Sequence, residues 1–250
     1  MSVADYSVAM DVVSRDGFAV LRRDAVDMLA AMPAQSVDLV ATDPAYESLE
    51  KHRASGTTTR LSHSKMSSND WFPIFANERF PELLAQMYRV LRRDRHAYIL
   101  CDDETSDIVK PMAKAVGFKV WDRLIWDKKT IGMGYHWRKR TEFILFLEKG
   151  KRRLNELGWP NVIECKRLQG KDLYPTEKPA EVFERLILNS TQPGELVLDP
   201  FAGSGASGEA ALASGRLWLG FDVVEDAVAR SRARCWKELD DARLVEGMAA

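Results

Sequence analysis

Two short stretches of the chain carry residue types that could do chemistry, and each follows an apolar run typical of a buried strand. Asp43-Pro44-Ala45-Tyr46 comes directly after the run at 37–42. It combines a carboxylate, an aromatic ring and a proline, whose fixed φ and missing N–H favour rigid presentation of a carbonyl. Aspartate and proline are also favoured turn residues, so this stretch taken alone could be only a turn.

The second stretch is a glycine-rich turn between two apolar runs, 195–199 and 216–222. Gly203 and Gly205 allow a sharp bend and let a ligand approach backbone N–H groups at the start of a helix. Asp222 ends the next run, where an acid can accept hydrogen bonds from ribose hydroxyls. The residues at 203–208 also match the dinucleotide pattern GxGxxG. A nicotinamide-dependent oxidoreductase, or simple close packing of a helix on a strand, therefore stays open.

Alternating strand and helix patterns must position these residues. The expected strands are 18–23, 37–42, 96–101, 118–126, 142–148, 195–199 and 216–222. The expected helices are 81–91, 105–116, 179–190, 206–215 and 224–239. This alternation predicts an α/β fold, a mostly parallel seven-stranded sheet with helices on both faces, in a single domain over 1–250. A polar loop without periodicity, 47–71, is inserted after Tyr46, and such a loop is usually functional or disordered.

Composition excludes several classes of protein. With 46% hydrophobic and 29% charged residues, the chain is typical of a globular protein. Its three cysteines include no CxxC pair and its four histidines have no metal-ligand spacing, so we expect neither a disulfide framework nor a metal site. No segment approaches the roughly 20 apolar residues of a membrane span, and we expect a cytoplasmic protein.

Basic residues are concentrated in one segment, although the formal net charge of the whole chain is -1. Residues 128–171 contain twelve lysines and arginines against four glutamates, a net +8, so the rest of the chain carries -9. Lysine and arginine make most protein contacts to nucleic-acid phosphates. A solvated surface is the alternative explanation for such a charge run.

Taken together, the motifs resemble those of the β-class DNA amino-methyltransferases, which use S-adenosylmethionine. The tetrapeptide 43–46 resembles their catalytic [DNS]PP[YFW] motif, and 199–205 resembles their FxGxG cofactor motif. YPTEKP at 174–179 resembles the segment before the cofactor motif, and 131–151 resembles the strand hairpin after the catalytic half. The catalytic motif precedes the cofactor motif, which is the circularly permuted order of the β-class. The resemblance implies a Rossmann-like methyltransferase fold.

For catalysis, the resemblance implies that Asp43 and the Pro44 carbonyl accept hydrogen bonds from the exocyclic amine of a flipped base, while Tyr46 stacks on that base. DPxY is more typical of adenine enzymes, so we expect N6-adenine methylation of DNA, with N4-cytosine methylation as the alternative. Ala45 stands where the family usually has a second proline. This departure concerns the rigidity of the loop and keeps a catalytically inactive DNA-binding relative open.

For the cofactor, the resemblance implies S-adenosylmethionine, with S-adenosylhomocysteine as product and no metal. The implied contacts are the glycine turn, Asp222 at the ribose, Thr176 and Lys178 near the methionine end, and an acid near the adenine ring. The full expected set is Asp24, Asp43, Thr176, Lys178, Asp199, Phe201, Gly203, Ser204, Gly205 and Asp222. Asp24 could instead be a simple helix N-cap, and Lys178 a surface lysine at a helix start.

We expect DNA contacts from the basic and aromatic cluster Trp137, Arg138, Lys139 and Arg140, and from Lys51, Arg53 and Arg60 in the inserted loop. The recognition segment of the family would fall at 151–173, which at 23 residues is too short to form a domain. Recognition would then be shared with the loop 47–71 or with a second protomer. The resemblance makes a homodimer, a nucleoid-associated location and a cognate restriction endonuclease reasonable expectations.

Overall fold

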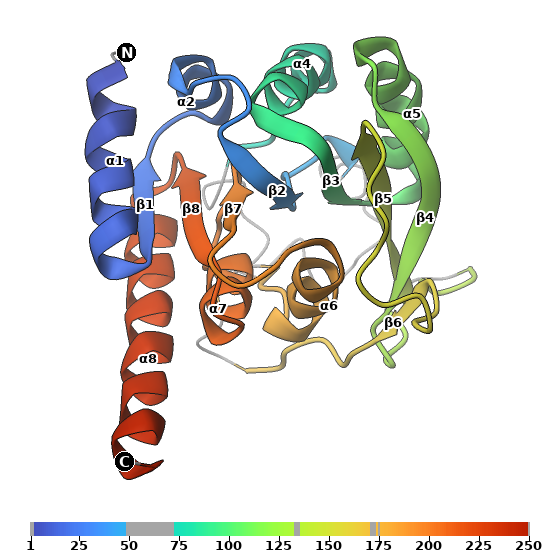
Figure 1. Cartoon of the computed structure of the whole chain (residues 1–250). Helices are drawn as coiled ribbons and strands as arrows, with labels where there is room; N and C mark the ends of the chain where they lie inside the picture. Colours follow the sequence, from blue (N-terminus) through green and yellow to red (C-terminus); the bar gives the residue numbers. More distant parts are fainter. Residues whose placement is uncertain (1–2, 49–72, 133–135, 171–173, 175, 250) are drawn as a thin grey trace.

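A single eight-stranded sheet forms the centre of the computed structural model, which describes residues 3–48, 73–132, 136–170, 174 and 176–249, without the side chains of 243–249 (Figure 1). The strand order is β1-β8-β7-β2-β3-β5-β4-β6. The strands are β1 (Phe18–Arg22), β2 (Val37–Thr42), β3 (Leu91–Cys101), β4 (Lys119–Asp127), β5 (Thr141–Lys149), β6 (Val162–Glu164), β7 (Leu196–Asp199) and β8 (Leu217–Asp222).

The sheet is mostly parallel. Only β5 pairs antiparallel with its neighbours, β3 and β4, so it alone runs against the other described strands. The pairs β1–β8, β8–β7, β7–β2, β2–β3 and β4–β6 are parallel. Every residue of β2 is buried, as expected for a central strand covered on both faces. The carboxyl ends of β1, β8, β7 and β2 therefore lie side by side at one edge.

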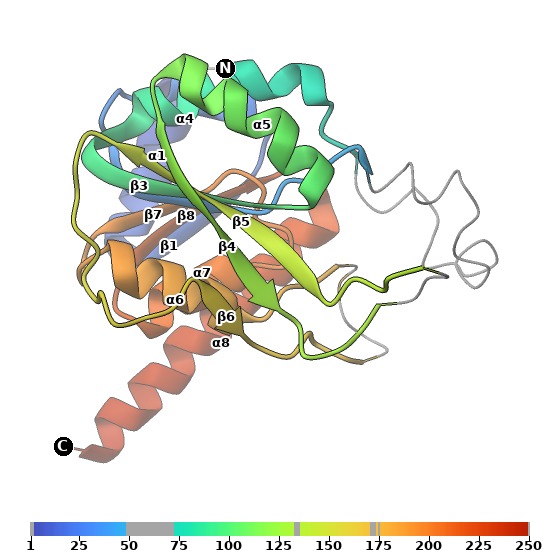
Figure 2. The same cartoon turned by 90° about the vertical axis from the view of Figure 1, so that its right-hand side faces the viewer.

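Helices cover both faces of the sheet (Figures 1 and 2). One face packs against α1 (Val3–Asp16), α2 (Ala25–Ala31), α4 (Phe80–Val90), which follows the short 3-10 turn η2 (Asn77–Arg79), and α5 (Asp103–Val116). The other face packs against α6 (Ala180–Ser190), α7 (Ala206–Ala213) and α8 (Glu225–Ala249). The C-terminal part of α8 projects beyond the body of the molecule (Figure 1). No helix among the described residues is long and apolar enough to cross a membrane.

The predicted α/β architecture is confirmed, with local differences. The eighth strand, β6, was not predicted, because three residues at a sheet edge are too few to show an alternating pattern. The sequence analysis also missed α1, and it ended α8 ten residues early. β3 begins at Leu91 rather than at residue 96, because the charged residues at its start are paired. The inserted loop lies outside the described residues apart from Glu47 and Ser48.

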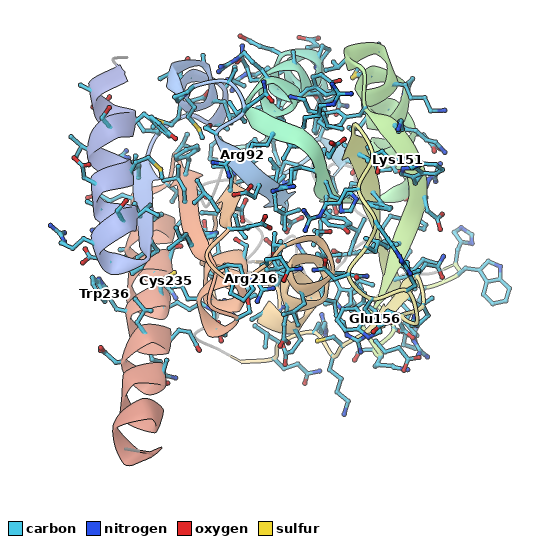
Figure 3. All side chains as sticks on the ribbon, in the orientation of Figure 1. Arg92, Lys151, Glu156, Arg216, Cys235 and Trp236 are labelled. Atoms are coloured by element: carbon cyan, nitrogen blue, oxygen red, sulfur yellow. The ribbon has the colours of Figure 1, made fainter. Side chains whose placement is uncertain are left out.

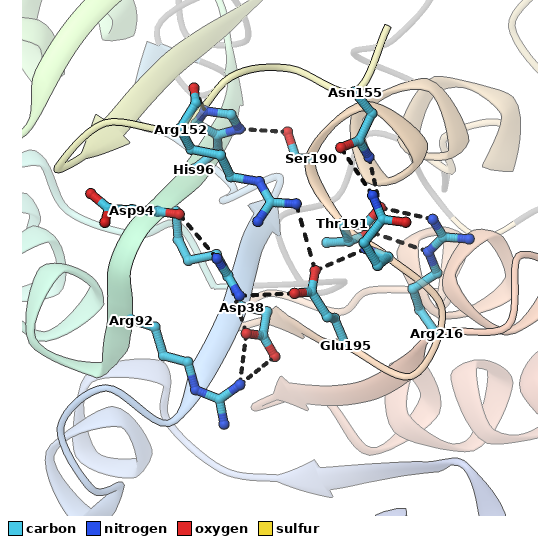
Figure 4. Close-up of polar contacts among 12 residues, drawn as sticks. Asp38, Arg92, Asp94, His96, Arg152, Asn155, Ser190, Thr191, Glu195 and Arg216 are labelled. Carbon is cyan, nitrogen blue, oxygen red and sulfur yellow. Dashed lines mark hydrogen bonds and ion pairs between the residues drawn. The ribbon is translucent and has the colours of Figure 1, made fainter.

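Buried charges tie together the amino-terminal edge of the sheet (Figures 3 and 4). Asp38 at the start of β2 accepts hydrogen bonds from Arg92 at 2.7 Å, from Arg95 at 3.2 Å and from the Leu196 N–H at 3.0 Å. This carboxylate is 2% exposed, and it joins the starts of β2, β3 and β7. The amino-terminal edge is thus closed by ion pairs, and the opposite edge is left to hold the candidate site.

Candidate active site

A cavity of about 860 Å³ opens at the carboxyl ends of the strands, where ligands bind in open α/β sheets. Asp43 follows β2, and Asp199 and Asp222 are the last residues of β7 and β8. The cavity brings together the two stretches that the sequence analysis singled out, although they lie far apart in the chain. The predicted residues that line it are Asp24, Asp43, Pro44, Tyr46, Thr176, Lys178, Asp199, Phe201, Gly203, Ser204 and Asp222.

Lys178 pairs with Asp43 inside this cavity. Its ammonium donates to Asp43 Oδ2 and also lies 3.8 Å from Oε2 of Glu142 on β5. Burial raises the pKa of Asp43, and the charge of Lys178 offsets this only in part. For Lys178, burial lowers the pKa, but the two carboxylates outweigh burial and hold its pKa above the ordinary value. The alternative of a surface lysine is therefore wrong, because this side chain is 12% exposed.

Glu142 and Lys128 belong to the same cavity and were missed by the sequence analysis. Lys128 donates to Glu142 Oε1 at 3.1 Å. Burial raises the pKa of Glu142, but Lys178 and Lys128 outweigh it, so the pKa of Glu142 lies below its ordinary value. Both residues stand at ends of strands in the β4–β5 hairpin, where polar residues are ordinary. The sequence held no signal that they face the cavity rather than solvent.

Tyr46 is held by a neighbouring segment. Its ring is 7% exposed and lines the cavity, and residue 46 forms an isolated parallel bridge with Phe75. The Phe75 N–H donates to the Ala45 carbonyl at 2.7 Å. Within the described residues, the Pro44 carbonyl accepts no hydrogen bond. The loop is thus fixed at Ala45 by a backbone hydrogen bond, although the usual second proline is absent.

Asp199 ties the end of β2 to the glycine turn. Its Oδ1 accepts hydrogen bonds from the Thr42 hydroxyl at 2.7 Å and from the Phe201 N–H at 3.0 Å, and its Oδ2 accepts one from the Ser207 hydroxyl. Burial raises its pKa to about 7, although these donors favour the carboxylate. The carboxylate is 2% exposed, so its main observed contacts are structural.

The glycine turn has the geometry that the sequence analysis expected. Gly203 and Gly205 have φ of 50° and 83°, the left-handed region that favours glycine. The Gly203 N–H donates to Asp222 at 2.9 Å, and the Val224 N–H donates to the other oxygen of Asp222, also at 2.9 Å. Each carboxylate oxygen keeps a further lone pair for a ligand. Gly205 does not line the cavity itself; it caps the start of α7.

The third glycine of the GxGxxG letters serves packing. A Cβ at Gly208 would lie 2.7 Å from Cys235 Sγ and 2.9 Å from the Trp218 ring. Close packing of α7 on β8 and α8 therefore explains this glycine, while the first two form the turn. The alternative of close packing is correct for one position of the motif and not for the other two.

Asp24 has both of the properties that were weighed for it. Its carboxylate caps α2 by accepting from the Val26 N–H at 3.0 Å, and it also lines the cavity. Arg79 donates to it twice, at 2.8 and 3.0 Å. Burial raises the pKa of Asp24, but Arg79 and the helix N–H groups outweigh this and lower it. The sequence analysis missed Arg79, which also lines the cavity and lies over the Phe75 ring.

The expected DNA-contact cluster lies at the connection between β4 and β5. Trp137 is fully exposed and Arg138 is exposed. Lys139 is paired with Asp103 at 2.5 Å, and Arg140 forms two hydrogen bonds to Asp127. Lys51, Arg53 and Arg60 lie outside the described residues. Over the described part of the chain, no group of three or more potential metal ligands is found.

This fold and cavity define a class: an open α/β sheet with a glycine turn and an Asp-Pro-x-Tyr loop meeting at one edge. Comparison with known proteins agrees. The family model for DNA methylases of the N6/N4 type matches residues 37–164 and 158–232. The chain therefore belongs to this family of DNA methylases.

Individual relatives cover most of the chain. The Escherichia coli K12 protein YubD is 32% identical over 205 residues, which is 82% of this chain and 84% of YubD. The type II methyltransferase M.HhaII of Haemophilus parahaemolyticus is 26% identical, covering 81% of this chain and 90% of its own. The DNA adenine methyltransferase YhdJ of Escherichia coli K12 is also 26% identical, covering 82% and 78%.

Solved structures share the fold. The complex of M1.HpyAVI with S-adenosylmethionine has a TM-score of 0.65 at 21% identity and covers 86% of this chain and 98% of that one. The cytosine-N4-specific PvuII DNA methyltransferase has a TM-score of 0.69 at 16% identity and covers 86% and 85%. Both kinds of relative, adenine and N4-cytosine, thus resemble this chain.

Proposed function

We propose that the chain is a site-specific DNA methyltransferase that moves the methyl group of S-adenosylmethionine to N6 of a flipped adenine. The observation that carries the proposal is that Asp43, Pro44 and Tyr46 share one cavity with the glycine turn and Asp222. Adenine is favoured by the Asp-Pro-x-Tyr sequence and by the similarity to YhdJ, which is named a DNA adenine methyltransferase. N4-cytosine is the second candidate, favoured by the fold of the PvuII enzyme.

The chemistry asks mainly for orientation. An exocyclic amine is a weak nucleophile because its lone pair is delocalised into the base. Hydrogen bonds from this amine to Asp43 and to the Pro44 carbonyl would turn it out of the base plane and hold it in line with the methyl group. The Tyr46 ring offers a stacking face, and stacking offsets part of the few kcal/mol that base flipping costs. Asp43 would act as an acceptor and need not remove a proton in the methyl-transfer step.

The cavity fits the cofactor. When bound, S-adenosylmethionine supplies an electrophilic methyl group on a sulfonium. A cavity of about 860 Å³ has room for a nucleoside cofactor together with a base. Asp222 would accept from the ribose hydroxyls, the Gly203–Gly205 turn would lie against the cofactor backbone, and Asp24 would lie near the adenine ring. Phe201, Ser204, Thr176 and Lys178 would line the remaining wall.

An inactive DNA-binding relative and an oxidoreductase are weaker candidates. The substitution at Ala45 suggested loss of rigidity, but the Phe75 N–H holds the Ala45 carbonyl. A nicotinamide enzyme has no evident use for an Asp-Pro-x-Tyr loop beside the cofactor turn. The remaining expectations are proposals as well: one domain over 1–250, a homodimer, a nucleoid-associated location and a cognate restriction endonuclease.

DNA recognition is proposed for the exposed cluster at 137–140, for the inserted loop 47–71 with Lys51, Arg53 and Arg60, and for the segment 151–173. In support, residues 167–170 of that last segment line the cavity. Transfer of tritium from methyl-labelled S-adenosylmethionine to unmethylated DNA tests the function. Incorporation by the purified protein is expected, whereas no incorporation into genomic DNA of varied composition, with S-adenosylmethionine bound, would contradict it.

A further inference from the structure

Glu142 is the one carboxylate in the cavity that neither the cofactor nor the target base accounts for. It stands near the start of β5, on the hairpin, and its side chain is 22% exposed. An isolated buried carboxylate is costly unless paired. Glu142 is paired twice, with Lys128 at 3.1 Å and with Lys178 at 3.8 Å.

Lys178 is therefore shared between two carboxylates. Its ammonium donates to Asp43 and lies within ion-pair distance of Glu142, and both acids are largely shielded from water. An ammonium fully committed to Asp43 would compete with the target amine, since both donate hydrogen bonds to the same carboxylate. A second carboxylate on the far side of the ammonium weakens that competition.

We propose that Glu142 is a positioning residue that draws the Lys178 ammonium partly away from Asp43 and so leaves Asp43 able to accept a hydrogen bond from the target amine. The inference rests on the proposed function, in which Asp43 accepts that hydrogen bond. Lys128, which lies on the other side of Glu142, holds the Glu142 carboxylate in place.

The charges around this group set the sign of its effect on pH dependence. Glu142 raises the pKa of Asp43 by repulsion, so removing its charge lowers that pKa. The acid limb of the pH profile of kcat then moves to lower pH. The titratable groups that face Asp43 and Glu142 are Lys178, Lys128, Tyr46, Cys101, Asp102 and Asp199. None of these is changed by a substitution at Glu142 alone.

The test compares Glu142→Gln, which keeps the shape and removes the charge, with Glu142→Asp, which keeps the charge on a shorter arm. We expect Glu142→Gln to lower kcat by about tenfold or more, with the acid limb about half a pH unit or more lower. Its dissociation constant for S-adenosylmethionine should stay within about twofold. Glu142→Asp should lose less activity and keep the wild-type acid limb.

Glu164→Gln is the matched control. Glu164 is a largely exposed carboxylate on β6 that pairs with Lys129 at 2.6 Å and does not line the cavity. It should leave kcat and the pH profile unchanged.

Three results would overturn the inference: unchanged kcat and acid limb in Glu142→Gln; lower kcat with an unmoved acid limb and a lower Tm, which would indicate a structural role; or weaker cofactor binding that accounts for the loss. If the wild-type protein methylates no DNA, the proposed function fails instead. The titration of the Asp43 carboxyl carbon by NMR then still tests the effect of Glu142, because it needs no turnover.

Discussion

Lys178 and Asp43 stand 135 residues apart in the sequence and form an ion pair inside the cavity. Asp43 follows the central strand β2, while Lys178 lies just before α6, so the sheet topology brings them together. The pair gives the Asp-Pro-x-Tyr loop a counter-ion, which a loop at a strand end would otherwise lack. It also makes the charge state of Asp43 a property of the cavity and not of the loop alone.

Tyr46 should contribute through its ring and not through its hydroxyl. Stacking of a base on an aromatic side chain is worth roughly 1 to 3 kcal/mol. We therefore expect Tyr46→Ala to lower kcat/KM for DNA by about 10- to 100-fold, and Tyr46→Phe to stay within about threefold of wild type. Steady-state methylation of a fixed DNA substrate measures both. Equal losses in the two variants would assign the effect to the hydroxyl.

Gly205 should be required by its surroundings as well as by its backbone. Its φ is 83°, and a Cβ there would approach Ser231 within van der Waals contact. Left-handed backbone costs an L-residue about 1 to 2 kcal/mol, and overpacking adds about 1 to 3 kcal/mol. Gly205→Ala should therefore lower the free energy of unfolding by about 2 to 5 kcal/mol.

Gly194→Ala is the control for that prediction, because Gly194 has φ of 80° with no atom within 4 Å of a Cβ. It should lose only the backbone part, about 1 to 2 kcal/mol, in urea unfolding. Equal losses at the two positions would show that contact with Ser231 is unimportant.

His96 should make the fold sensitive to acid. It is fully buried; its Nδ1 lies 2.8 Å from the Ser190 hydroxyl and its Nε2 lies 3.2 Å from the Arg152 carbonyl. A carbonyl only accepts, so Nε2 carries the proton and Nδ1 accepts from Ser190. Burial lowers the pKa of His96 to about 4 from an ordinary value of 6.5.

The neutral form is favoured in the folded state, so its contribution to stability is present above pH 6.5 and is lost as the pH falls toward 4. The loss should be about 2 to 3 kcal/mol of unfolding free energy at most. Urea unfolding of wild type and His96→Gln between pH 4 and 7 measures it. A variant with the same pH dependence as wild type would refute the assignment.

Arg138 should contribute to DNA binding through phosphate contact. It is exposed in the cluster at the β4–β5 connection, where Lys139 and Arg140 are already paired with acids. Arg138→Ala should weaken binding on all sequences alike and lower the slope of log K against log salt by about 1. Fluorescence anisotropy over a salt series measures the slope. A loss confined to one DNA sequence would instead indicate base readout.

Much of the fold could be predicted because the central strands are continuous apolar runs bounded by turns. β2 is predicted at its observed ends, and the acids after β2, β7 and β8 are predicted to meet because parallel strands place their carboxyl ends at one edge. Lys178 illustrates the limit: its position near the site was expected from resemblance, but its contact with Asp43 was not. Glu142, Lys128 and Arg79 could not be found, since a charged residue at a strand or helix end is ordinary and only the tertiary fold turns it inward.

The central claim is that this cavity methylates adenine in DNA. Modification-sensitive single-molecule sequencing of DNA from a host without adenine methylases tests it most directly, with the chain and its Asp43→Ala variant expressed in parallel. We expect N6-methyladenine at one short sequence motif with the wild-type chain and none with Asp43→Ala, while both proteins bind S-adenosylmethionine with similar affinity. Unmodified DNA from the wild-type host, or equal modification by the variant, would contradict the account, and N4-methylcytosine in place of methyladenine would overturn the base assignment.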